Sequence, residues 1–208
     1  FNHIEEEKRA NVEGYIVSQA SIELADYPKV RTFAGDTVPY HNDGANAVQE
    51  LAIALAIASK QAKQAGSYEA LANKFFVNFA IDTQFFAEIA KLRAFKVLWK
   101  AFATGFGAEA IAVPIVAETS VRSFSKVDVY VNLLRAGNEA FAGAIGGADV
   151  FTVHAHDALS KPNATSTRIA RNVLLLTKEE SQVLDVLDPA GGSYFIESLT
   201  ADYVKEAW

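Results

Sequence analysis

Short apolar stretches alternate with longer amphipathic stretches along most of the chain. The short stretches have the length of β-strands, and the longer ones repeat apolar residues at steps of three and four, as a helix with one buried face does. Successive short stretches begin roughly 40 residues apart, a spacing typical of βα units. The pattern therefore predicts four parallel strands joined by crossover helices. The expected strands are residues 30–35, 75–81, 110–119 and 149–157.

The first two expected helices have readable limits. Residues 46–65 stack apolar side chains on one side, with Asn42 and Asp43 as candidate N-terminal caps and Gly66 as the terminating residue. The next helix carries a wide apolar stripe from Phe85 onward, broad enough to be buried against a sheet.

The last two expected helices follow the same pattern. One opens at Ser125 and Asp128, which have the spacing of a capping box, and closes at Gly146 and Gly147. The other lies near residues 165–187.

Two further local signals modify this outline. Pro114 lies inside the third expected strand, where it would remove a ladder hydrogen bond, so that strand is expected to be shorter than drawn. Gly191, Gly192 and Ser193 predict a tight turn, followed by a short apolar run at residues 194–196.

Four βα units fit two architectures. They could form one half of a (β/α)8 barrel of the TIM type or a small open, doubly wound α/β sheet, and periodicity alone does not choose between them. Residues 29–208 hold the βα units, and residues 1–28 are interpreted as a leading helical segment.

Composition narrows the class of protein. Apolar residues make up 50% and charged residues 21% of the 208 residues, as in an ordinary globular domain. The net charge of -6 is spread along the chain without a basic cluster, so we expect no nucleic-acid partner. The longest mostly apolar stretch, residues 51–58, is well below the roughly 20 residues of a membrane span. With no signal-peptide pattern and no cysteine, the expected location is the cytoplasm.

Candidate chemistry lies just after the expected strands, because βα folds present reactive groups at the carboxyl ends of their strands. His41 follows the first strand and precedes a helix, where an imidazole could hydrogen-bond a substrate carbonyl. An equally weighted interpretation is that His41 is a polar loop residue or local cap without a substrate role.

His154 and His156 are two residues apart in a strand-like run, so a regular strand would point both to one face. Together with His41 they suggest a metal-dependent barrel hydrolase. Two ligands on one strand fall short of the three or four of a zinc site, so an interior polar layer is the preferred interpretation and no metal site is expected.

Three stretches together resemble the substrate-binding barrel of the methylmalonyl-CoA mutases: EIAKLRAFKVLW at residues 88–99, RIARNVLLLTKEES at 168–181 and VLDPAGGSYFIESLT at 186–200. The stretch YHNDGANAVQELAIALA at residues 40–56 is similar to the segment of that family that holds a catalytic histidine. The resemblance runs in order from about residue 27 to residue 208.

The resemblance implies an adenosylcobalamin-dependent carbon-skeleton isomerase. In that family a (β/α)8 barrel binds acyl-CoA along its axis and a separate flavodoxin-like domain holds the cofactor. This chain would be the C-terminal half of the barrel, without a cobalamin-binding domain. Adenosylcobalamin is then expected in the parent enzyme and not on this part alone.

His41 matches the catalytic histidine of the family, but other positions depart from the catalytic pattern. Lys74 stands where the pattern has an arginine, and Phe76 where it has a serine. Glu118 replaces a glutamine in AETSVRS, which resembles SQTSGWS, and His156 replaces an asparagine. The expected site has His41 as its catalytic residue. The expected substrate-binding residues are Tyr40, Lys74, Glu118, His154 and His156.

These departures favour the small, non-catalytic subunit of a heterodimeric mutase, because Glu118 would repel an anionic substrate. The implied partners are a large catalytic subunit and, in the complex, acyl-CoA. Alone, this part of the protein should be inactive and should self-associate through its open sheet edges. A catalytically active mutase chain and the metal-dependent hydrolase remain the alternatives.

Overall fold

The computed structural model describes residues 4–18, 22 and 24–208. Its centre is a parallel sheet of four strands in the order β3-β4-β5-β6. Strands adjacent in sequence are adjacent in the sheet, as consecutive βα units of a barrel require. The fold is therefore α/β and consistent with a partial TIM-type barrel, as predicted. The strands are β3 (Phe33–Asp36), β4 (Phe75–Ile81), β5 (Ile115–Thr119) and β6 (Val150–Thr152).

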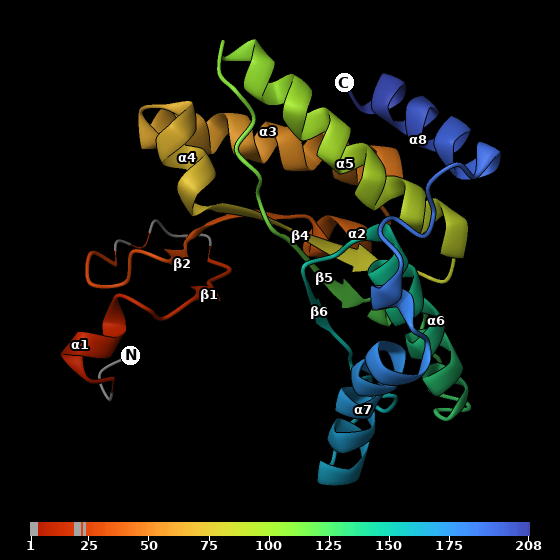
Figure 1. The fold of residues 1–208 in the computed structure, drawn as a ribbon. Coiled ribbons are helices and arrows are strands. Elements are labelled where there is room, and N and C mark those ends of the chain that lie inside the picture. Colours follow the sequence, from red (N-terminus) through yellow and green to blue (C-terminus); the bar gives the residue numbers. More distant parts are fainter. Residues whose placement is uncertain (1–3, 19–21, 23) are drawn as a thin grey trace.

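Helices α3, α5 and α8 lie together over one face of the sheet, while α7 projects away from it (Figure 1). The contacts between α5 and α8 and between α5 and α6 make α5 the central helix of this layer. The helices are α2 (Val38–Asn42), α3 (Ala47–Ala65), α4 (Tyr68–Lys74), α5 (Phe85–Gly105), α6 (Val131–Gly146), α7 (Ala164–Glu180) and α8 (Tyr194–Ala207), with short 3-10 turns η1 (Val121–Ser123) and η2 (Val183–Asp185).

The core lies between β4 and the helical layer. Every residue of β4 is buried, and its alternate residues Phe75, Val77, Phe79 and Ile81 join the main apolar cluster. The Phe75 ring stacks on Trp99 of α5, with 4.9 Å between the ring centroids. Burial of such large side chains supplies most of the driving force that holds α5 on the sheet.

The other face of the sheet corresponds to the inner wall of a barrel. Alternate strand residues point to this face, and the strand register places them in rows. Near the amino end, Phe76 is covered by the ring of Tyr15, with 5.3 Å between centroids. One row contains Asp36, Asn78, Val116 and Val150, and the next contains Ala80, Glu118 and Thr152.

The leading segment differs from the expected helix. Within the described part of residues 1–28, the only helix is α1 (Glu6–Arg9), and β1 (Gly14–Tyr15) pairs in parallel with β2 (Val30–Arg31). The expected strand 30–35 is therefore divided, because its first residues pair with β1 and only the remainder enters the main sheet. The prediction of a helical leading segment was wrong for these residues.

The predicted limits of α6 were correct at one end only. Gly147 ends the helix in the left-handed conformation, with φ 80°, as expected for a glycine after a helix. The proposed capping box was wrong: Ser125 and Asp128 each accept a backbone N–H bond from two residues further along. These bonds stabilise the loop, and the helix begins later, at Val131.

Two strands are shorter than the expected runs, and an apolar run expected after a turn begins a helix. Strand β5 begins directly after Pro114, as the proline predicted. Strand β6 ends at Thr152, five residues before the expected end. The tight turn at 191–193 is present, but the apolar run after it is the start of α8 at Tyr194, a helix that the pattern of residues 194–196 did not reveal.

Candidate functional site

Polar side chains gather where the strands end, on the same side of the sheet as the carboxyl termini of β3, β4 and β5. His41 lies on α2, which follows β3. Asp82 directly follows β4, and Ser120 directly follows β5. Because parallel strands end at one edge, these three residues meet although up to 79 positions separate them in sequence.

The start of α3 is fixed by a true capping box. The Asn46 side chain accepts the Gln49 N–H at 3.0 Å, and the Gln49 side chain accepts the Asn46 N–H at 3.0 Å. The expected caps Asn42 and Asp43 do not serve this helix. With its first turn held in this way, α3 places Glu50 on its buried side, facing His41.

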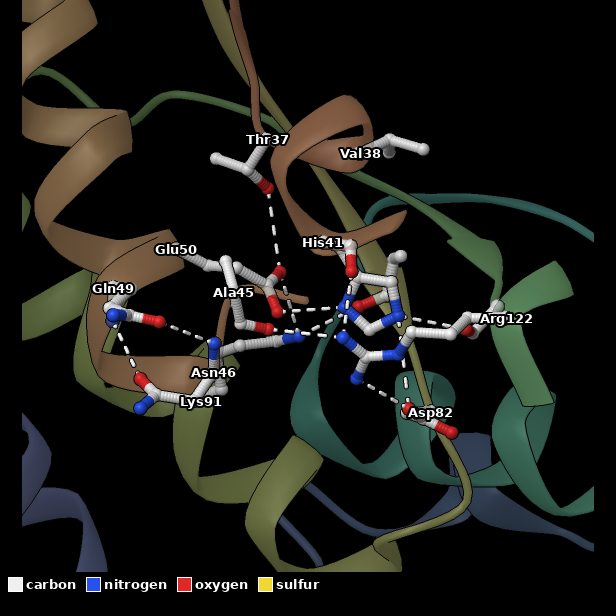
Figure 2. A network of polar contacts seen from close by, with 12 residues as sticks. Thr37, Val38, His41, Ala45, Asn46, Gln49, Glu50, Asp82, Lys91 and Arg122 are labelled. Atoms are coloured by element: carbon white, nitrogen blue, oxygen red, sulfur yellow. Dashed lines mark hydrogen bonds and ion pairs between the residues drawn. The ribbon is translucent and has the colours of Figure 1, made fainter. Parts of the chain in front are cut away.

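His41 is fully buried and both ring nitrogens are engaged (Figure 2). Nδ1 lies 2.9 Å from Glu50 Oε1, and Nε2 lies 2.7 Å from Ser120 Oγ. A carboxylate can only accept, so Nδ1 carries a hydrogen and donates to Glu50. Nε2 is paired with the Ser120 hydroxyl and also lies 3.8 Å from Asp82 Oδ2. Glu50 fixes the orientation of the imidazole, and Ser120 occupies its other nitrogen.

Lys91 of α5 continues this network into the core. Its Nζ is 3.1 Å from Glu50 Oε2 and 2.6 Å from Glu88 Oε2, and it donates to the Ala80 carbonyl at 2.7 Å. Burial alone would lower the pKa of Lys91, but the carboxylates of Glu88 and Glu50 outweigh it and raise that pKa. Lys91 is therefore a buried cation that holds two helices to the end of β4.

Arg122 of η1 ties the loops above His41 together. It donates to the carbonyl oxygens of His41 at 2.7 Å and Ala45 at 3.2 Å, and to Asp82 Oδ2 at 2.7 Å. Burial works to raise the pKa of Asp82, but the hydrogen bond from Arg122 and its positive charge lower it overall. Asp82 is thus held as a carboxylate.

A small polar cavity of about 170 Å³ adjoins this network, and its lining includes Glu50, Asp82, Glu88, Arg122 and Tyr203. A water molecule occupies about 30 Å³ of liquid volume, so the cavity has room for a few waters. Typical ligand pockets are larger, about 300–1,000 Å³. The cavity does not provide an acyl-CoA with access to His41.

The inner wall carries a separate, acidic group of side chains. Asn78 Nδ2 donates to Asp36 Oδ1 at 3.0 Å, and Glu118 Oε1 lies 3.4 Å from His154 Nε2. Burial raises the pKa of Asp36, the hydrogen bonds from Asn78 and Val38 oppose this, and the charge of Glu118 adds to the rise. Among the expected substrate-binding residues, the structure thus brings Glu118 and His154 together.

The other expected substrate-binding residues lie elsewhere. Lys74 precedes β4, at the amino end of the sheet, and its Nζ donates to the carbonyls of Pro28 at 2.7 Å and Val30 at 3.1 Å. Tyr40 is 46% exposed on α2 and lines a surface hollow of about 340 Å³ with Asp36. Neither Lys74 nor Tyr40 contributes to the hydrogen bonds of the His41 side chain.

His154 and His156 do not share a strand face, because β6 ends before them. His156 stacks on Tyr130, with 5.4 Å between ring centroids, whereas His154 faces Glu118. Within residues 4–18, 22 and 24–208, no group of three or more histidine, cysteine or acidic side chains is arranged to hold a metal ion. The ligand set of the alternative hydrolase is not assembled.

The sequence pattern did not single out Glu50, Lys91, Arg122 or Glu139 as members of a site. A signal for three of them was present: Glu50, Lys91 and Glu139 are charged residues at positions that the helical period places on a buried, apolar face. Their partners could not be read from that signal, because each pairs with residues far away in the chain.

The fold and this arrangement define a barrel-type α/β protein with polar groups at the carboxyl ends of its strands. The sequence profile described as methylmalonyl-CoA mutase matches residues 15–208. The chain belongs to the methylmalonyl-CoA mutase family.

Curated relatives support this assignment. The chain is 38% identical to the methylmalonyl-CoA mutase small subunit of Streptomyces virginiae, over 88% of this chain and 30% of the relative. It is 36% identical to the small subunit of Porphyromonas gingivalis, over 88% of this chain and 31% of the relative. It is also 38% identical to the methylmalonyl-CoA mutase of Escherichia coli, over 79% of this chain and 24% of the relative. The chain thus spans less than a third of the length of these relatives.

None of the helices in the described residues has the length and apolarity that a membrane crossing requires.

Proposed function

We propose that this chain is part of the small, non-catalytic subunit of a heterodimeric methylmalonyl-CoA mutase, where it supports a large catalytic subunit. The relatives named small subunits favour this over the catalytically active alternative. The complex would interconvert methylmalonyl-CoA and succinyl-CoA in the cytoplasm, and acyl-CoA would be bound along the axis of the complete barrel.

The burial of His41 is the observation that carries the proposal. The four-stranded sheet of the described residues is open and does not close into a barrel, yet the His41 side chain is only 1% exposed. Further strands could only cover it more. With Glu50 on one nitrogen and Ser120 on the other, His41 has no free nitrogen to offer a substrate carbonyl. Its role in this chain is to join the loops at the carboxyl end.

The charge of the inner wall supports the same conclusion. Asp36 and Glu118 lie in adjacent rows of that wall. Among the described residues, His154 is the only basic side chain that pairs with Glu118. A methylmalonyl group carries a free carboxylate, which two nearby acidic side chains would repel. Lys74 could attract an anionic part of an acyl-CoA, but only at the opposite, amino end of the sheet.

His41 does not fit the cobalt of adenosylcobalamin. A cobalt-ligating histidine needs one free ring nitrogen, and both nitrogens of His41 are engaged. We therefore assign the cofactor to another part of the parent enzyme, and derive no step of this chain through it.

Turnover by separated subunits tests the proposal. The full-length polypeptide that contains this chain is assayed with adenosylcobalamin and methylmalonyl-CoA, alone and with its large partner, and succinyl-CoA is measured. We expect product only when the large subunit is present. Product formed by the small polypeptide alone would favour the active-chain alternative.

A further inference from the structure

Glu139 is a fully buried acid that the proposed function does not use. It lies on α6, behind the end of β5. Its Oε2 accepts the Ser120 N–H at 3.1 Å, a hydrogen shared with the Ile81 carbonyl at 2.9 Å, and its Oε1 lies 2.8 Å from Ser123 Oγ. Glu139 thus contacts the first residue after β5 and the last residue of η1.

The hydroxyl of Ser123 shows where a proton must sit. Ser123 Oγ is 2.8 Å from Glu139 Oε1 and 3.0 Å from the Ser120 carbonyl oxygen, but it has one hydrogen for these two acceptors. If Glu139 were ionised, two oxygens would face each other without a hydrogen between them. If Glu139 is protonated, it donates to Ser123 Oγ, which donates to Ser120 O, and Oε2 still accepts the Ser120 N–H. Only the protonated acid satisfies all three contacts.

Carboxylates face Glu139 from the end of β4, where Asp82 lies, and from α5, where Glu88 is ion-paired with Lys91. Burial is the chief cause that raises the pKa of Glu139, and the carboxylates of Asp82 and Glu88 raise it further. The hydrogen bonds from Ser123 and Ser120 oppose the rise but do not cancel it, and the pKa is about 8.

The nearby cations are occupied with other partners. Arg122 of η1 binds Asp82, and Arg135, one turn before Glu139 on α6, donates to Asn132. His41 reaches this region through the Ser120 hydroxyl and through Asp82, whose Oδ2 lies 3.8 Å from Nε2. No residue in the described part of the chain forms an ion pair with Glu139, so nothing there would compensate its negative charge.

We propose that Glu139 is a proton-controlled latch, which holds η1 over His41 while protonated and releases it when ionised. The mechanical link is Arg122, which lies within η1 and binds the carbonyl oxygens of His41 and Ala45. An ionised Glu139 would draw water or repel Asp82 and Glu88, and either response breaks the contacts that Glu139 makes with Ser120 and Ser123, while the bond from the Ser120 N–H to the Ile81 carbonyl stays. The carboxyl end of the half-barrel would then open at alkaline pH while the apolar core stays closed.

Hydrogen exchange of the full-length protein tests this latch at about pH 6.5 and about pH 9, with rates corrected for intrinsic exchange. In the wild type we expect the protection of residues 120–124 to fall at least about tenfold between these two pH values. A tenfold change in protection corresponds to a shift of one pKa unit. Residues 75–81 of β4 should keep their protection. In Glu139→Gln the new amide donates to Ser123 Oγ and its oxygen accepts the Ser120 N–H, so protection should persist at pH 9. Glu179→Gln, on the exposed side of α7, is the matched control and should behave as the wild type.

Equal protection of residues 120–124 at both pH values in the wild type would overturn the proposal, as would an alkaline loss in Glu139→Gln equal to that of the wild type. Infrared spectroscopy of the wild type keeps the test decisive if the variant does not fold. The carbonyl stretch of a buried, protonated carboxylic acid should be present near neutral pH and should vanish together with the protection of residues 120–124. Loss of protection without loss of that band, or absence of the band near neutral pH, would also overturn it.

Discussion

Replacement of Lys91 by methionine probes the buried charge network most severely. The substitution keeps the length and apolar stem of the side chain but removes its charge. It leaves the carboxylates of Glu50 and Glu88 without their shared cation and the Ala80 carbonyl without a donor. Breaking a buried ion pair in this way costs about 3–5 kcal/mol. We therefore expect Lys91→Met to lower the free energy of unfolding by about 3–5 kcal/mol near pH 8.

The loss of unfolding free energy in Lys91→Met should increase as the pH rises. Burial already raises the pKa of Glu88 against the opposing charge of Lys91, so removal of Lys91 raises that pKa further above its value in the unfolded chain. Such groups contribute stability at low pH and lose it as pH rises. The destabilisation by Lys91→Met should thus be smaller near pH 5 than near pH 8, by at least about 1.4 kcal/mol for one unit of pKa.

Urea unfolding followed by circular dichroism measures these differences. Lys100→Met is the matched control, because Lys100 is on the same helix but exposed, and it should change stability by less than about 0.5 kcal/mol. Adding Glu88→Gln to Lys91→Met should recover part of the loss, since one unpaired carboxylate is removed. A loss below about 1 kcal/mol, or one that does not vary with pH, would refute the account of Lys91 as the cation that holds this network.

Two further predictions concern packing and the sheet edges. Gly143→Ala should lower the stability by about 1–3 kcal/mol in thermal unfolding, because its Cβ would overlap the Phe151 ring, whereas Gly137→Ala on the same helix meets no atom within 4 Å and should be neutral or stabilising. The polypeptide of residues 1–208 should self-associate through the unpaired edges of β3 and β6, with sedimentation that depends on concentration. A monomer at high concentration would argue against exposed pairing edges.

The fold could be predicted where one signal dominated. Strand β4 was located at residues 75–81 because its run is apolar on both faces, and β5 was shortened by Pro114 as expected. The start of helix α8 was missed because Tyr194 and Phe195 are exposed there, so the apolar run does not mark a buried face. The local pattern reports burial, and it fails where an exposed residue is apolar.

The site was less predictable than the fold for a related reason. The position of His41 after a strand was visible, but its partners were not, since Ser120 is 79 residues away and Glu50 is nine. The strand-period argument for His154 and His156 failed because β6 ends at Thr152. Which polar groups meet depends on strand ends and loop paths, and these follow from tertiary packing.

Kinetic measurement of a His41 variant in the assembled enzyme is the most direct test of the account. The heterodimer is assembled with either the wild-type small subunit or His41→Gln, and kcat and KM for methylmalonyl-CoA are measured on preparations with equal amounts of folded complex. The account predicts a lower unfolding temperature for His41→Gln, because a buried hydrogen-bonded group is altered, with kcat per folded complex within about twofold of the wild type. A loss of kcat of about a hundredfold or more in a folded, fully assembled complex would show that this histidine acts in catalysis and would contradict the account.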